Sequence, residues 1–205
     1  MMSLSRRVTA IALLSLMTAC SSSSVPPPRL FVLSPLQVPP SGDHAVSGMT
    51  EILVAQTQVP DYLDRPQIVE RTTSNELKLV DEDQWAERLS INVSRVVAQN
   101  LTTMVPADAN VAAAARASLP YEFQVSVSLN NFELDQSGAA ILEGRWSVTN
   151  AEGTKELAAA NVSMREPAKQ PGIAAAVEAM NANLGGVCRD IAAELKKLVA
   201  AGQPK

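Results

Sequence analysis

The alternation of apolar and polar positions predicts several strands. Apolar residues alternate with polar ones from Tyr121 to Leu129, which is the pattern of a half-buried strand. Strands are also predicted at 140–149 and 156–165, and short polar turns would join all three into an antiparallel meander. Four shorter strands are predicted earlier in the chain, at residues 29–33, 51–55, 67–71 and 76–80.

A spacing of three to four residues between apolar positions predicts two long helices. The first covers residues 83–104, with Trp85 opening its buried stripe and Asp81–Asp83 supplying carboxylates at its start. The second runs from Ile173 to Leu198, and its Gly185-Gly186 pair predicts either a kink or the close approach of another backbone.

The alanine-rich residues 112–117 are expected to form a short helical turn. Together, these elements predict an α+β fold: a mainly antiparallel or mixed sheet with two main amphipathic helices packed on it.

The amino terminus carries an export signal. Arg6 and Arg7 precede a short apolar run that ends at Ala19, and a membrane-spanning helix needs about 20 apolar residues. The run closes as Leu-Met-Thr-Ala-Cys, which resembles the lipobox of bacterial lipoproteins, although Met17 stands where that pattern prefers Leu. The resemblance implies cleavage between Ala19 and Cys20 and lipid attachment at Cys20. The alternatives are an ordinary signal peptide and an uncleaved anchor.

The chain is thus expected to comprise a signal peptide (1–19), a lipidated Ser/Pro tether (20–28) and a single domain (29–201). Ser21 resembles the default that directs lipoproteins to the outer membrane. Removal of Arg6 and Arg7 with the signal leaves 15 basic and 21 acidic residues, a formal charge of −6. That balance argues against a nucleic-acid partner.

Candidate chemistry is sparse. His44, the one histidine, lies in a loop rich in proline and glycine, and the two cysteines leave Cys188 unpaired if Cys20 carries lipid. Cys188 is expected to be a small core residue, the alternative being a reactive thiol. Because no hydrolase elbow, phosphate-binding glycine loop or metal-ligand spacing is found, we expect no enzyme activity, catalytic residue, metal or cofactor.

Three segments resemble the ABC-type transport auxiliary lipoproteins, the family that includes PqiC. These segments are FVLSP at 31–35, VPDYLDRPQIV at 59–69 and WAERL at 85–89. The resemblance implies a non-enzymatic outer-membrane lipoprotein that works with a membrane-anchored MCE protein in lipid transport. It also implies a homo-oligomer, and a transported lipid is a further candidate ligand.

The candidate interaction site is a proline-stiffened loop. Its residues are Tyr62, Leu63, Asp64, Arg65 and Pro66. One interpretation is a docking surface for the MCE partner or a sibling subunit, because a stiff loop loses little entropy on binding. The other is a structural crossover in which Tyr62 and Leu63 fill the core and Asp64 pairs with Arg65 or Arg71. Rival functions are a periplasmic lipid-binding carrier and an envelope hydrolase.

Overall fold

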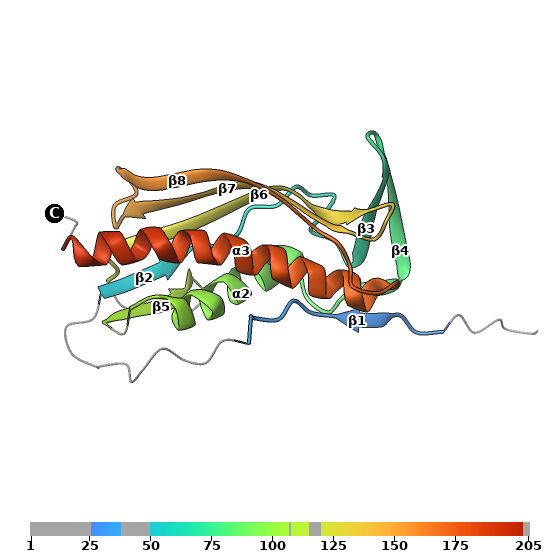
Figure 1. The fold of residues 1–205 in the computed structure, drawn as a ribbon, viewed down its shortest axis with the longest axis horizontal. Helices are drawn as coiled ribbons and strands as arrows, with labels where there is room; N and C mark the ends of the chain where they lie inside the picture. Colours follow the sequence, from blue (N-terminus) through green and yellow to red (C-terminus); the bar gives the residue numbers. More distant parts are fainter. Residues whose placement is uncertain (1–25, 38–49, 107, 115–119, 203–205) are drawn as a thin grey trace, which may run out of the picture.

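A computed structural model describes residues 26–37, 50–106, 108–114 and 120–202. The predicted signal peptide, its cleavage site, Cys20 and His44 lie outside these residues. Within the described part, eight strands and two helices form the fold (Figure 1). The strands are β1 (Arg29–Phe31), β2 (Thr50–Val54), β3 (Gln67–Thr73), β4 (Glu76–Trp85), β5 (Ala109–Ala113), β6 (Phe123–Asp135), β7 (Ala140–Asn150) and β8 (Glu156–Glu166).

The strands form one mixed sheet built around β6. On one edge β6 pairs antiparallel with β7, which in turn pairs antiparallel with β8. The other edge is shared: β2 pairs in parallel with the first part of β6, and β3 pairs in parallel with its end. The remaining strands extend this edge, since β5 adds to β2, β4 to β3 and β1 to β4. The predicted meander and the predicted 67–80 hairpin are therefore confirmed.

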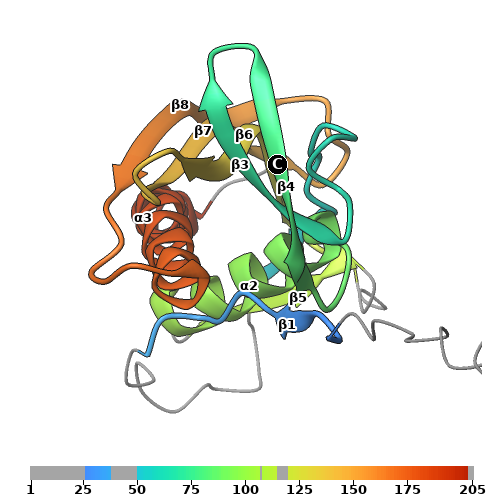
Figure 2. The ribbon, with the colours of Figure 1, turned by 90° about the vertical axis from the view of Figure 1, so that its right-hand side faces the viewer.

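The two helices, α2 (Leu89–Met104) and α3 (Ile173–Ala200), lie inside the curve of the sheet (Figure 2). Helix α3 packs on β7 and β8, while α2 packs on α3, β5 and β2. Their apolar stripes meet inward-facing residues of β6 and β7 in one core. Its fully buried members include Val93, Val97, Leu101, Phe123, Val125, Leu142, Leu184, Val187 and Ile191. The α+β class with a mixed sheet is confirmed.

The predicted start of the first helix is wrong. Residues 81–85 continue β4, and α2 begins only at Leu89. Strand β4 persists because it has a partner on each side: Asp83 and Trp85 pair with β1, and the Trp85 amide donates to the carbonyl of Pro66. Sheet pairing thus outweighs the local carboxylate signal. Trp85 is buried, as expected, but at the end of a strand.

The expected helical turn at 112–117 is also wrong where the structure describes it. Ala109–Ala113 form β5, a parallel edge strand in register with Thr50–Val54. Alanine favours helix only weakly when a neighbouring strand offers a full set of hydrogen bonds.

Helix α3 continues without a break through the Gly185-Gly186 pair. The space over the two glycines is occupied by side chains, not by another backbone. A β-carbon at Gly185 would lie 2.4 Å from Cδ1 of Leu36, and one at Gly186 would lie 2.9 Å from Sδ of Met164. The glycines therefore let the side chains of Leu36 and of Met164 on β8 pack closely against the helix.

Candidate functional site

The loop at 59–66 joins β2 to β3 and is mostly anchored to the domain. Leu63 belongs to the core, being 1% exposed. Tyr62 is half-buried, and its hydroxyl lies 3.1 Å from the carbonyl oxygen of Asn130 on β6. Asp61 and Pro66 are exposed, and Arg65 is half-buried. Fewer residues of this loop are therefore available to contact a partner than the sequence indicates.

Asp64 holds the amino-terminal end of α2. Its Oδ1 accepts a hydrogen bond from the Ser90 amide at 3.0 Å, and its Oδ2 accepts one from Nε of Arg88 at 2.9 Å. Burial opposes the charged form, but the hydrogen bonds from Ser90 and Arg88 outweigh it and hold the pKa of Asp64 below its usual value. This carboxylate is the helix cap that the sequence assigned to Asp81–Asp83. The expected pairing of Asp64 with Arg65 or Arg71 is wrong.

Arg71 pairs instead with Glu133 of β6, a side chain that is 1% exposed. One oxygen of Glu133 accepts from Nε of Arg71, and the other has no hydrogen-bond partner. Burial, followed by the nearby Glu133 carboxylate, raises the pKa of the Tyr62 hydroxyl. The hydrogen bond from the Tyr62 hydroxyl to Asn130 thus attaches the loop to β6.

The segment that follows the predicted tether is fixed to both helices. The Ser34 amide donates to Oδ1 of Asn181 on α3 at 3.0 Å, and the Leu36 amide donates to Oδ1 of Asn100 on α2 at 2.8 Å. We call these two hydrogen bonds the asparagine clasp. With Leu33 buried and Leu36 over Gly185, the clasp fixes where the chain enters the domain.

Strand β1 is joined to β4 by a charge pair as well as by its ladder. Nε of Arg29 lies 2.6 Å from Oδ1 of Asp83, whose side chain is 4% exposed. A second hydrogen bond, from the Arg29 guanidinium to Oδ2 of Asp83, makes the pair bidentate at 2.8 Å. The position of β1 is thus set immediately after residues 20–28.

Cys188 is an inert core residue. It is fully buried on α3, and its sulfur is 3.6 Å from Nδ2 of Asn100. Burial raises the pKa of the Cys188 thiol to about 12. Because the thiolate is the reactive form, the structure supports the core role expected from the sequence.

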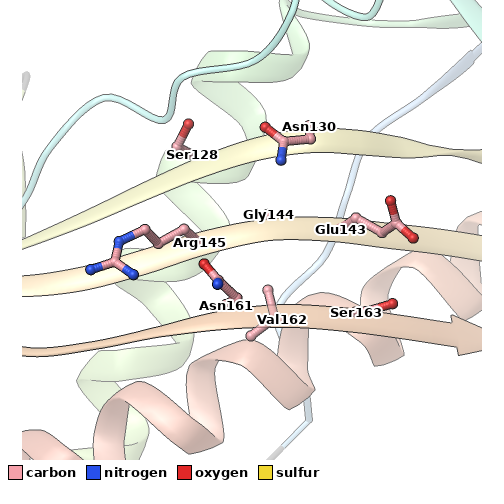
Figure 3. Close-up of a pocket in the computed structure, with 8 residues that line it drawn as sticks. All are labelled: Ser128, Asn130, Glu143, Gly144, Arg145, Asn161, Val162 and Ser163. Carbon is pink, nitrogen blue, oxygen red and sulfur yellow. The ribbon is translucent and has the colours of Figure 1, made fainter.

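A shallow polar pocket lies on the sheet face that points away from the helices (Figure 3). Its residues are Ser128, Asn130, Glu143, Gly144, Arg145, Asn161, Val162 and Ser163. Arg145 is paired with Glu156, and Glu143 accepts from Asn131. These contacts are those of a solvated antiparallel face, and they converge on no common point.

Among the described residues, no three His, Cys, Asp or Glu side chains gather in a way that could hold a metal ion. In the same part of the chain, no helix is long and apolar enough to cross a membrane.

Sequence reasoning missed the asparagine clasp and the pairing of Arg29 with Asp83. Asn100 and Asn181 interrupt apolar helix faces, and that local signal marks them as residues that have a hydrogen-bond partner within the fold. Nothing in the sequence says that the partner is the backbone at residues 34 and 36, because those positions lie 64 or more residues away.

Two solved structures share this α+β architecture. One is an uncharacterized protein, with 19% identity, a TM-score of 0.68 and coverage of 83% of this chain and 99% of its own. The other is a protein from Xanthomonas campestris, with 17% identity, a TM-score of 0.67 and coverage of 85% and 100%. A PelC dodecamer from Paraburkholderia phytofirmans resembles the chain less, with 9% identity, a TM-score of 0.42 and coverage of 73% and 93%. No curated protein matches the sequence.

The fold is thus shared with these two solved structures along almost the whole of their chains. The chain belongs to the ABC-type transport auxiliary lipoprotein component family, whose model matches residues 31–192. The match begins at Phe31 in β1, includes the loop at 59–66 and ends in α3. The family predicted from the three sequence segments is therefore confirmed.

Proposed function

We propose that this protein is a non-enzymatic docking subunit of an MCE-type lipid transport system, held at the outer membrane by lipid on Cys20. The observation that carries the proposal is membership of the auxiliary lipoprotein family across residues 31–192. The sequence Leu-Met-Thr-Ala-Cys at 16–20 supports cleavage after Ala19 and lipidation of Cys20, and Ser21 supports the outer membrane as the destination. Residues 29–201 then form the single periplasmic domain.

The docking surface is the exposed part of the loop at 59–66. Asp61 and Pro66 are exposed and Arg65 is half-buried, while Tyr62, Leu63 and Asp64 hold them in place from beneath. A surface fixed in this way loses little conformational entropy when a partner binds. The partner is the MCE-domain protein of the transport system, and several copies of this chain form a homo-oligomer around its end.

Anchoring is tested by Cys20→Ala and cell fractionation. The wild-type protein should sediment with the outer membrane, and the variant should remain soluble in the periplasm and lose the transport phenotype. An unlipidated form that keeps full transport activity would contradict the anchoring role.

Docking is tested by photo-crosslinking in cells from positions 61, 65 and 66, with exposed Glu178 on α3 as the matched control position. Capture of an MCE-domain protein from the loop, and not from 178, is expected. Capture of sibling subunits alone would assign the loop to assembly and refute partner docking there. Mass spectrometry of gently purified protein tests the rival lipid carrier, which should retain one lipid per chain.

A further inference from the structure

Exposed apolar side chains lie on the neighbouring segments where the chain enters the domain. Among the described residues, three large hydrophobic side chains are exposed: Leu30 at 65%, Val32 at 45% and Ile91 at 45%. Single exposed apolar residues are common on soluble proteins and need no explanation. These three are different because all of them lie at β1 or in the first turn of α2. We call them the entry patch.

The backbone places the members of the entry patch on neighbouring segments. Phe31 and Leu33 point into the domain, so the alternating residues Leu30 and Val32 point outward. The Ala86 amide donates to the carbonyl of Phe31, which joins the end of β1 to the turn before α2. Both ribbon views show β1 beside α2, on the side away from β8 (Figures 1 and 2).

Two arginines beside the entry patch are paired with carboxylates of the domain. Arg29 and Arg88 have exposed guanidinium groups, but each is paired with a carboxylate whose side chain is less than a tenth exposed. The patch therefore offers apolar contact flanked by polar hydrogen-bonding groups. That combination suits the headgroup boundary of a bilayer, where apolar side chains insert among the acyl chains and guanidinium groups remain hydrated.

The length of the tether identifies the occupant. Leu30 lies ten residues after Cys20, and a fully extended chain spans at most about 3.6 Å per residue, so Leu30 cannot lie more than about 36 Å from Cys20. Three side chains are too few for a stable protein interface, which needs about 800 Å² from each partner. They are sufficient to orient a domain that its anchor already holds at the surface.

We propose that Leu30, Val32 and Ile91 rest on the bilayer that holds the Cys20 lipid and fix the orientation of the domain upon it. This inference rests on the lipidation of Cys20 in the proposed function. In this orientation β1 faces the membrane and the outer face of β8 points away from it.

The test uses the lipidated full-length chain in vesicles of phosphatidylethanolamine and phosphatidylglycerol. Single cysteines replace Leu30, Val32, Ile91 or the exposed Ser163 of β8, and each is labelled with an environment-sensitive maleimide dye. Cys188 stays unlabelled because it is buried. Quenching by spin-labelled lipid should be about twofold or more stronger at 30, 32 and 91 than at 163. It should persist at high salt, because the contact is apolar.

A second variant tests whether the patch acts as a unit. Leu30→Glu combined with Val32→Glu should reduce the quenching at position 91 to the level of position 163, whereas Ser163→Glu should leave it unchanged. Equal quenching at 30 and 163 in vesicle-bound protein would overturn the inference and leave the anchor intact. Protein that fails to float with vesicles would overturn the anchor as well. Concentration-dependent shielding at 30 without lipid quenching would assign the patch to contacts between copies, and so refute membrane contact.

Discussion

The carboxylate of Asp64 joins two segments that are distant in the sequence. It lies in the loop at 59–66, yet it accepts hydrogen bonds from Ser90 and Arg88 at the start of α2. A residue of the candidate interaction loop therefore also stabilises a helix. Mutations at Asp64 will change stability as well as any binding, so it is a poor position at which to test docking.

We expect Asp64→Ala to lower the free energy of unfolding by about 2 kcal/mol, because the first turn of α2 loses its cap. Arg88→Ala is the matched control. It should cost less than about 1 kcal/mol, since its side chain is 66% exposed and surface pairs contribute little. Urea denaturation at pH 7 measures both, and equal losses in the two variants would contradict the capping role.

The same carboxylate should make stability depend on pH. Because the pKa of Asp64 is lower in the folded than in the unfolded chain, its charge stabilises the fold fully above a pH of about 4. This contribution is lost as the pH falls through the folded-state pKa. The stability difference between wild type and Asp64→Asn should therefore shrink below pH 4. A difference that stays constant down to pH 2 would show that the charge is not involved.

Gly144 marks a place where β6 and β7 come unusually close. A β-carbon there would lie 2.3 Å from the backbone oxygen of Ser128, next to the irregularity in β6 between Leu129 and Asn131. Gly144→Ala should therefore destabilise the domain by about 1–3 kcal/mol, because a strand backbone must shift. Gly186→Ala is the control and should be nearly neutral. There the flexible Met164 side chain can move, and the helix gains about 1 kcal/mol of propensity. Thermal melting compares the two.

At the scale of elements, strands and helices with a strong internal pattern were predictable. The alternation in β6 and the long 3.6-residue period in α3 fix which face is buried before any tertiary contact forms. The start of α2 and the strand β5 were not predictable. Both depend on neighbours supplied from elsewhere: β1 and β3 extend β4 to Trp85, and β2 turns Ala109–Ala113 into a strand.

The candidate site also has a part that could be predicted from the sequence and a part that depends on tertiary contacts. The lipid-attachment sequence around Cys20 is local and can be recognised in the sequence alone. The loop at 59–66 was found by its resemblance, but its residues could not be sorted into buried and exposed, because Leu63 and Asp64 receive their roles from the core and from α2. The entry patch was missed for a related reason. Its two segments, at β1 and at Ile91, are far apart in the sequence and are brought together by the pairing of β1 with β4 and by the hydrogen bond from Ala86 to Phe31.

The asparagine clasp gives a prediction at this scale. Asn100→Ala should lower the free energy of unfolding by about 1–3 kcal/mol, because the Leu36 amide loses its partner in a partly buried setting. Asn181→Ala should cost less, since its hydrogen bond to Ser34 is exposed to water, which can replace it. Urea denaturation of the two variants checks the order. A larger loss at Asn181 would contradict it.

At the scale of the whole molecule, the domain boundary can be tested by truncation. The described core residues lie between Leu33 and Leu195, so a chain that begins at Arg29 should unfold at the same denaturant concentration as the unlipidated full-length mature chain. A chain that begins at Pro35 loses β1 and Leu33, and it should be less stable by about 2–5 kcal/mol. Equal stability of the two truncated chains would show that the first segment is not part of the domain.

The route by which the chain enters the domain also determines how the protein responds to force. Tension on a membrane anchor at residue 20 would reach the fold at Arg29, so the bonds loaded first are the pair with Asp83 and the three-residue β1–β4 ladder. Behind them, the clasp at Ser34 and Leu36 attaches the segment next to the buried Leu33 to both helices. The long ladders of β6, β7 and β8 lie outside this path. Under tension, β1 can therefore detach from β4 and lengthen the tether while the core stays folded.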